Sequence, residues 1–259
     1  MAGQARVLTA GMTDVGRKRT HNEDSYAIVE DENLYLVADG MGGHSSGEVA
    51  SKMAIETMRE FFQATSADPE ATWPYKMDKT RGYEENRLVT GIKLANRRIY
   101  EAAQRESRLH GMGTTMVCLL AVRDGALIGH VGDSRVYRLR GESLEQLTED
   151  HSLLNDYIKM KSMTPEEIEN FPHKNVIVRA LGMKETVKVD AILDRPRPGD
   201  LYILCSDGLA GPASDEEIRE IALGHRDLKQ AAQAMIDKAN ANGGPDNVTA
   251  VLCRWIGSS

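Results

Sequence analysis

The sequence of 259 residues has few cysteines, few aromatic residues and no excess of basic residues. Its three cysteines, Cys118, Cys205 and Cys253, stand singly in or beside apolar runs, which is typical of reduced core thiols rather than of disulfides or a zinc site. Aromatic residues make up 5% of the chain, and 32 Lys and Arg face 39 Asp and Glu. This composition excludes a base-stacking platform and a general binder of nucleic acid or anionic membranes, although one small phosphate group remains a compatible ligand.

Long apolar stretches are also missing. The longest strictly apolar run, 116–122, is far shorter than a membrane span, and the first residues lack the basic-then-apolar order of a signal peptide. No linker-like composition and no repeat of solenoid period divides the chain. We therefore expect a cytoplasmic protein with no membrane partner and a single domain over 1–259. Two polar stretches with prolines, 68–85 and 151–174, are predicted to be irregular, and the second is a candidate surface flap.

Strand-length apolar segments alternate with helical patterns. The expected strands are 25–29, 34–38, 114–122, 126–131, 136–139, 201–205 and 248–252. The expected helices begin at about 45, 86, 214 and 227 and run to about 61, 108, 223 and 240. The step Arg123-Asp124-Gly125 favours a tight hairpin, so part of the sheet should be antiparallel and a doubly wound parallel fold is disfavoured.

Acidic residues stand at the ends of these apolar strands. They are Asp39, Asp133 and Asp207 after strands, and Asp246 and Glu23 before strands. Like charges gathered in one cleft raise one another's pKa, so their convergence calls for hard cations. Oxygen-only ligands favour Mg²⁺ or Mn²⁺ over zinc. Neighbouring glycines such as Gly40 let a backbone carbonyl approach a metal, although a single Asp-Gly step is more often an ordinary turn.

Seven ordered motifs between Gly11 and Leu252 resemble the metal-dependent (PPM) type 2C Ser/Thr protein phosphatases in their bacterial form. The motifs are Arg19 with Glu23-Asp24, 37–44 (VADGMGGH), 113–115 (GTT), 131–135 (VGDSR), 147–152 (LTEDHS), 206–209 (SDGL) and 245–247 (PDN). The resemblance implies an α+β fold, a four-layer α-β-β-α sandwich with two central antiparallel sheets flanked by helices. That fold agrees with the predicted hairpin and amphipathic helices.

The resemblance also implies roles for the acidic residues. Two ions, Mn²⁺ or Mg²⁺, are implied, and some members of the family hold a third, weaker one. The implied ligands are Asp39 as the bridge, the Gly40 carbonyl, Glu23 for the second ion, Asp207 and Asp246 for the first, and Asp133 with Asp207 for the third. Asp24 and Asn247 are expected around the ions, where they orient waters or neighbouring carboxylates rather than bind a metal directly.

The implied activity is hydrolysis of phosphoserine and phosphothreonine without a covalent enzyme intermediate. Two metal ions lower the pKa of a bridging water, and the hydroxide attacks phosphorus in line. Arg19 and Asp39 are the expected catalytic residues. Arg19 matches the phosphate-binding arginine of the family, and its planar guanidinium can pair with two phosphate oxygens.

The identity of the leaving-group acid stays open. Animal members of the family have a histidine directly after the Asp-Gly step, whereas this chain has Met41, which cannot donate a proton. A metal-bound water and a nearby histidine such as His44 are the alternatives, although His44 equally fits a helix start. His151 is interpreted first as a structural hydrogen-bonding group, with ordering of the flap as its alternative.

Two functions of other classes compete with the phosphatase. A catalytically silent relative that binds phosphoproteins would be favoured by loss of a metal carboxylate, but all of the implied ligands are present. A calcium-binding structural domain would need an Asp-x-Asp-x-Asp-Gly loop, whereas these acids are spread along the chain. We therefore expect a signalling phosphatase whose partners are phosphoserine and phosphothreonine proteins, including a Ser/Thr kinase that it opposes. On the resemblance alone, we expect a monomer.

Overall fold

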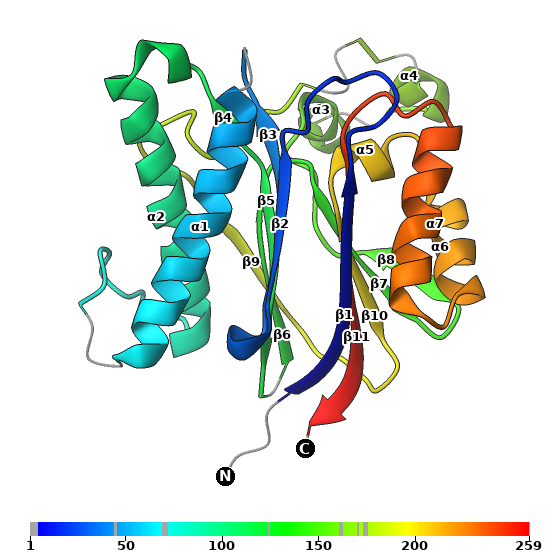
Figure 1. The fold of residues 1–259 in the computed structure, drawn as a ribbon, viewed down its shortest axis with the longest axis horizontal. Helices are drawn as coiled ribbons and strands as arrows, with labels where there is room; N and C mark the ends of the chain where they lie inside the picture. Colours follow the sequence, from blue (N-terminus) through cyan, green and yellow to red (C-terminus); the bar gives the residue numbers. More distant parts are fainter. Residues whose placement is uncertain are drawn as a thin grey trace.

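Two antiparallel sheets pack face to face and carry helices on their outer faces (Figure 1). The computed structural model describes residues 5–43, 46–68, 72–123, 125–160, 163–169, 171–172 and 176–258. Every strand pairing within these ranges is antiparallel. The fold is the α-β-β-α sandwich that the family resemblance implies.

The first sheet has the strand order β1-β11-β10-β7-β8, and the second has the order β2-β3-β5-β6-β9, with β4 beside β3. The strands of the first sheet are β1 (Ala5–Asp14), β7 (Arg135–Arg140), β8 (Ser143–Gln146), β10 (Leu201–Cys205) and β11 (Val248–Ser258). Those of the second are β2 (Asp24–Val29), β3 (Leu34–Met41), β4 (Gly113–Thr114), β5 (Met116–Val122), β6 (Gly125–Val131) and β9 (Asp190–Asp194). The predicted hairpin joins β5 and β6, while Asp124 lies outside the described residues.

Four long helices form the outer layers. The second sheet is covered by α1 (Ser46–Ala67) and α2 (Tyr83–Arg105), and the first by α6 (Asp215–Gly224) and α7 (Leu228–Ala241). The short elements are α3 (Leu153–Met160), α4 (Pro165–Glu169), α5 (Asp207–Ala210) and two 3₁₀ turns, Glu30–Glu32 and Ser107–Leu109. Helix α2 ends three residues earlier than predicted, because the backbone of Glu106 is extended and the 3₁₀ turn follows.

The central strands contribute side chains to two hydrophobic cores, one on each face of the sheet. In β3, Leu36 and Ala38 pack toward α1 and α2, whereas Tyr35 and Val37 pack into the core between the sheets. Side chains alternate along a strand, so a strand that is buried on both faces is apolar at every position. This explains why the apolar segments of the sequence correspond to the sheet interior.

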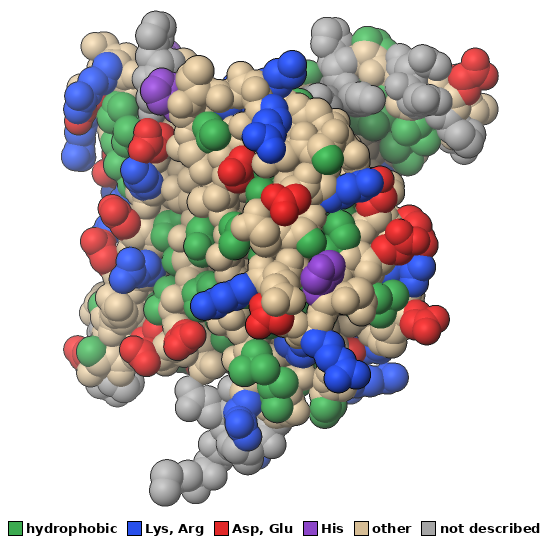
Figure 2. All heavy atoms as spheres, turned by 45° about the vertical axis from the view of Figure 1, so that its right-hand side comes forward, with side chains coloured by type: hydrophobic (Ala, Val, Ile, Leu, Met, Phe, Trp, Pro, Cys, Tyr) green, Lys and Arg blue, Asp and Glu red, His purple; other side chains and the backbone are tan. Residues whose placement is uncertain are grey.

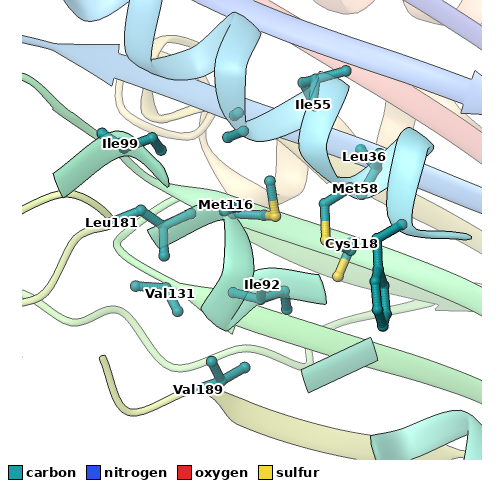
Figure 3. Close-up of a cluster of buried hydrophobic side chains, with 14 of the residues drawn as sticks. Leu36, Ile55, Met58, Ile92, Ile99, Met116, Cys118, Val131, Leu181 and Val189 are labelled. Atoms are coloured by element: carbon teal, nitrogen blue, oxygen red, sulfur yellow. The ribbon is translucent and has the colours of Figure 1, made fainter. Parts of the chain in front are cut away.

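The core below α1 and α2 is closely packed around sulfur-containing side chains (Figure 3). Met58 from α1, Ile92 from α2 and Cys118 from β5 are fully buried and point toward one another. Burial raises the pKa of the Cys118 thiol, which disfavours the reactive thiolate. All three cysteines are buried and unpaired, as predicted.

Some elements differ from the sequence expectations. The prediction that 151–174 is irregular is wrong, because this stretch contains α3 and α4. Thr164 and Glu167 form a reciprocal cap at the start of α4, and Pro165 occupies its first position, where a proline is tolerated. Strands β1, β8 and β9 were not predicted. The stretch 68–85 ends inside α2 rather than before it.

The surface is mixed in charge. Figure 2 shows Lys and Arg side chains interspersed with Asp and Glu on the face that carries α6 and α7, and neither sign forms a continuous field there. None of the helices in the described ranges has both the length and the apolar composition needed to cross a membrane.

Candidate metal centre and phosphate site

The acidic strand ends converge at one end of the sandwich, near the top of Figure 1. Asp39, at the end of β3, lies directly across the β2–β3 pairing from Asp24. Asp207 follows β10 as the first residue of α5, and its carboxyl group lies close enough to that of Asp39 for each to perturb the pKa of the other. Residues from both sheets therefore meet in one acidic cluster.

A cleft of about 550 Å³ opens beside this cluster. Asp133, Asp207 and Asp246 line it, so carboxylates from two loops and from the start of α5 face one space. Its lining also includes Ser152 and Leu154, which belong to the predicted flap. A phosphorylated side chain that entered the cleft would reach these carboxylates from the solvent side.

Mutual repulsion and burial perturb the acids. Burial, reinforced by Asp24, Asp207 and Asp133, raises the pKa of Asp39 well above its usual range. Burial also raises the pKa of Asp24 to about 7, and burial with the nearby Asp207 raises the pKa of Asp133 to about 7. The pKa of Asp207 is raised by burial and by Asp246. A cluster of this kind holds its negative charge at neutral pH only with cations.

Glu23 is fixed next to Asp39 and Gly40, near the end of β3. Its carbonyl oxygen accepts hydrogen bonds from the Gly40 amide at 3.1 Å and from the Ser51 hydroxyl at 2.6 Å. Gly47, in the first turn of α1, packs so closely that an added Cβ would lie 2.7 Å from the Gly40 carbonyl carbon and 2.9 Å from Glu23 Cδ. Only glycine allows this contact, which brings the start of α1 against the Glu23 carboxylate.

Arg19 lies on the rim of the cluster. Its Nη2 donates a hydrogen bond of 2.7 Å to Asp246, and its side chain is 52% exposed. The Arg17 and Lys18 amides both donate to the Gly244 carbonyl, so the β1–β2 loop rests on the α7–β11 loop. These two loops, blue and red-orange, lie side by side in Figure 1. The guanidinium is therefore close to the carboxylates and open to solvent.

Asn247 fixes the backbone of the β1–β2 loop. Its Oδ1 accepts from the Glu23 amide at 2.8 Å, and its Nδ2 donates to the carbonyls of Val15 at 2.9 Å and His21 at 2.8 Å. Asn247 is 5% exposed. Its side chain thus fixes loop backbone, whereas the sequence analysis expected it to orient waters or carboxylates.

The chemistry of the donor set fits hard divalent cations. One carboxylate oxygen each of Asp24, Asp133 and Asp207 is buried without a hydrogen-bond partner. Unpartnered buried anionic oxygens of this kind suit Mg²⁺ or Mn²⁺. Among the described residues, no three Asp, Glu, His or Cys side chains surround a single point as a finished coordination sphere. The carboxylates are instead engaged with one another and with Arg19.

Hydroxyl residues that the sequence analysis did not single out support the acids. Thr115 Oγ1 accepts from the Asp39 amide at 3.0 Å and lies 2.7 Å from Ser134 Oγ. Ser206 and Thr249 both donate to Asp24 Oδ2, at 2.8 Å and 2.6 Å. The only sequence signal for Thr115 was its place in the Gly-Thr-Thr motif, since an uncharged hydroxyl residue does not stand out in composition.

The two histidines considered in the sequence analysis have different outcomes. His44 lies outside the described residues. His151 is 6% exposed and hydrogen-bonded through both ring nitrogens, which fits the structural interpretation. Met41, directly after Gly40, is half-buried at the end of β3.

The chain is similar to known proteins over most of its length. The family model described as protein phosphatase 2C matches residues 15–254. A Listeria welshimeri protein named serine/threonine phosphatase stp is 37% identical over 247 residues, which cover 93% of this chain and 92% of that protein. The structure of the Mycobacterium tuberculosis serine/threonine phosphatase PstP/Ppp matches with a TM-score of 0.84 and 34% identity, covering 97% of this chain and 99% of that one. The catalytic domain of PstP in complex with two manganese ions matches with a TM-score of 0.79 and 33% identity, covering 97% and 99% of the two chains.

Proposed function

Because this chain belongs to the protein phosphatase 2C family and is a metal-dependent serine/threonine phosphatase, we propose that its clustered carboxylates hold the metal ions of the reaction. The proposed ligands are Asp39, Gly40, Glu23, Asp207 and Asp246 for two ions, with Asp133 and Asp207 for a third. The observation that carries this assignment is the contact of Asp39 with Asp207, two acids whose pKa values are both raised.

Mn²⁺ or Mg²⁺, when bound, supplies Lewis-acid activation of the attacking water and neutralises charge on the phosphoryl group. The residues of the chain position the substrate. Arg19 donates from an exposed guanidinium beside Asp246, so it can turn to pair with two phosphate oxygens. Asp24 and Asn247 support the groups around the proposed metal ligands. Asp24, which is paired with Asp39 across β2 and β3, accepts hydrogen bonds from two hydroxyl groups. Asn247 accepts a hydrogen bond from the Glu23 amide and so fixes the backbone there.

The substrates are phosphoserine and phosphothreonine proteins, and a Ser/Thr kinase that the enzyme opposes in signalling is a proposed partner. A cytoplasmic location is supported by the three buried thiols, none of which forms a disulfide. We propose that the chain works as a single catalytic domain over 1–259, which the shared core between the two sheets supports. The monomeric state stays a prediction, which light scattering on the purified protein would test.

The catalytically silent alternative is not favoured. It would be expected to lack part of the carboxylate set, whereas Glu23, Asp39, Asp207 and Asp246 are all present and lie around the same end of the sheets. Acids that served only a structural purpose would gain stability from pairing with cationic side chains. Here the carboxyl groups of Asp39 and Asp207 instead lie close to each other, and this proximity of like charges is unfavourable unless the site has a use for them.

The test is phosphate release from a phosphothreonine peptide with Mn²⁺, with Mg²⁺ and with a chelator, for the wild type and Asp207→Asn. We expect metal-dependent turnover that the chelator abolishes and that falls at least about 100-fold in the variant. Asp237→Asn, an exposed carboxylate change on α7, is the matched control. Failure of the wild type on several peptides and on an aryl phosphate at saturating metal would reject the enzyme assignment and favour the silent regulator.

A further inference from the structure

His151 joins the start of the predicted flap to the end of β6. Its backbone amide donates to the Gly132 carbonyl at 2.8 Å, and the Gly132 amide donates to His151 Nδ1 at 3.0 Å. The backbone and the ring of His151 therefore both form hydrogen bonds with Gly132. Gly132 is buried, has φ +114°, and directly precedes Asp133.

The ring of His151 has one arrangement that satisfies these contacts. Because Nδ1 accepts the Gly132 N–H, the proton of the neutral imidazole is on Nε2. That nitrogen lies 2.9 Å from Asp190 Oδ2, the acceptor it needs. Arg179 Nη1 donates to the same oxygen at 3.1 Å and also lies 2.9 Å from Nε2, to which it cannot donate while Nε2 carries the proton, so Asp190 is the acceptor for both groups. The buried His130 ring stacks on His151 with centroids 4.3 Å apart, which keeps the ring in place.

The first residues of the predicted flap, 151–153, are paired with residues 176–179, which lie just after it, and these two segments are called the flap stems. The Leu153 amide donates to the Val176 carbonyl at 2.8 Å, and the Val178 amide donates to the His151 carbonyl at 2.9 Å. Arg179, which ends the second stem, shares Asp190 with the imidazole. Both stems are thus attached to the residue that holds Gly132.

From Gly132 the contacts continue to the centre of the acidic cluster. Ser134, on the other side of Asp133, lies within hydrogen-bond distance of the Thr115 hydroxyl, at 2.7 Å. The Thr115 hydroxyl accepts from the Asp39 amide, and the Thr115 amide donates to the Asp39 carbonyl at 2.8 Å. Asp133 therefore lies between Gly132, which bonds to His151, and Ser134, which is linked to Asp39 through Thr115.

We propose that His151 is a positioning residue that fixes Asp133 through the Gly132 amide and ties the flap stems to the same point through Asp190. The inference rests on the proposed function for the role of Asp133, but its geometry is independent of turnover. A phosphoprotein that contacts the flap stems would thereby contact an element that also sets the position of a carboxylate in the cleft.

Two substitutions separate the two contacts of the ring. In His151→Asn the amide oxygen can take the place of Nδ1 and accept from Gly132, while the reach to Asp190 is lost. In His151→Gln the side-chain amide can reach Asp190, while Gly132 loses its acceptor. His225→Asn, remote from the cluster at the end of α6, is the matched control.

The primary measurement is hydrogen exchange of the Gly132, Leu153 and Val178 amides in chelator. We expect His151→Asn to keep Gly132 protected and to speed exchange at Leu153 and Val178 about tenfold, and His151→Gln to deprotect Gly132. Kinetics with Mn²⁺ supply the second measurement. His151→Gln should lower kcat about 10-fold to 100-fold on both a phosphothreonine peptide and p-nitrophenyl phosphate. His151→Asn should keep kcat on the aryl phosphate and raise KM for the peptide alone.

Equal protection of Gly132 in the two variants, or an equal change of kcat in both, overturns the proposal. If His151→Gln does not fold, His151→Asn decides, because an unchanged peptide KM together with unchanged stem exchange overturns the link to the flap. If the wild type turns over neither substrate, the proposed function fails, and the exchange pattern alone supports or overturns the positioning role.

Discussion

The Arg19 guanidinium donates a hydrogen bond of 2.7 Å to the Asp246 carboxylate, across 227 positions of sequence. The side chains are 52% and 33% exposed, respectively. A solvent-exposed ion pair of this kind contributes little to stability. The pair therefore holds a cation at the mouth of the acidic cleft, where a phosphate would compete with Asp246 for it.

Removal of the Arg19 guanidinium should impair turnover without unfolding the protein. We expect Arg19→Ala to lower kcat/KM about 10-fold to 100-fold, which corresponds to the loss of charge-assisted hydrogen bonds of about 1.5–3 kcal/mol. The kcat/KM of Arg19→Lys should lie between those of the wild type and Arg19→Ala, because an ammonium group keeps the charge but lacks the planar fork of a guanidinium group. Steady-state kinetics on a phosphothreonine peptide measure the effect, with Lys18→Ala as the control. A kcat/KM for Arg19→Ala equal to that of the control would contradict the phosphate role.

Gly47 should not tolerate a side chain. In Gly47→Ala the new Cβ would lie 2.7 Å from backbone and 2.9 Å from Glu23 Cδ, so α1 must move away from Gly40. We expect a loss of stability of about 1–3 kcal/mol, together with a marked loss of Mn²⁺-dependent activity. Gly224→Ala, at the open end of α6, is the control and should be neutral or stabilising by about 0.4–1 kcal/mol. Urea unfolding and activity assays of both variants decide the matter.

The effect of Asp207→Asn on stability should change sign when metal is added. In chelator at pH 8 the variant should unfold at a higher temperature than the wild type, because one of several buried, mutually repelling carboxylates is removed. With Mn²⁺ at about 100 times its Kd the wild type should gain about 2.7 kcal/mol, and the variant much less. Thermal unfolding with and without metal tests this. Equal Mn²⁺-induced shifts in the two proteins would exclude Asp207 as a ligand.

Acid should destabilise the fold through His130. Burial, with the neighbouring His151, lowers the pKa of His130 from 6.5 to about 3 in the folded protein. Between these two values the unfolded chain binds a proton that the folded protein does not, so stability rises with pH and is lost on acidification. The contribution of His130 to stability falls by about 2 kcal/mol from pH 7.5 to pH 5. The buried acids Asp24 and Asp133 act in the opposite direction, because their raised pKa values make the folded protein bind protons more readily than the unfolded chain. Urea unfolding at both pH values should show that His130→Asn lacks the contribution of His130 and that the exposed His110→Asn keeps it.

Arg87 should matter for stability alone. It donates to Glu32 at 2.9 Å and to the Phe62 carbonyl at 2.6 Å, and its guanidinium lies 4.2 Å from the centre of the Phe62 ring. Arg87→Ala leaves the carboxylate of Glu32, only 10% exposed, without its buried partner, at an expected cost of about 3–5 kcal/mol. Arg108→Ala, on an 80% exposed side chain, should change stability by less than about 0.5 kcal/mol. Activity per folded molecule should be unchanged in both variants.

The strands with the clearest sequence signal are those that are buried on both faces. Strand β3 was visible because Tyr35 and Val37 enter one core while Leu36 and Ala38 enter the other. Strands β1 and β9 were missed because they lie at sheet edges, where Leu8 and Leu193 are 57% and 58% exposed and no apolar pattern survives. Helices α3 and α4 were missed because prolines near them were given too much weight.

For the candidate site, the sequence supplied the charged groups and not their supports. An aspartate at the end of an apolar strand stands out, which is why Asp39 and Asp207 could be nominated. The roles of Thr115 and Asn247 depend on which backbone groups the packing of the sheets brings within about 3 Å of them. The contacts of Asn247 join it to residues 224 and more positions away, so no local pattern contains them.

The pairing of β1 with β11 constrains how the protein can be made. Thr13 and Asp14 align with Thr249 and Val248, and the ladder extends from there to Ala5 and Ser258. During synthesis on the ribosome the first strand has no partner until the last strand has emerged, and such long-range pairing slows folding. Arg19 and Asp246, on the loops beside this ladder, come together at the same late moment. A growing chain should therefore acquire no phosphatase activity until β11 has emerged and paired with β1.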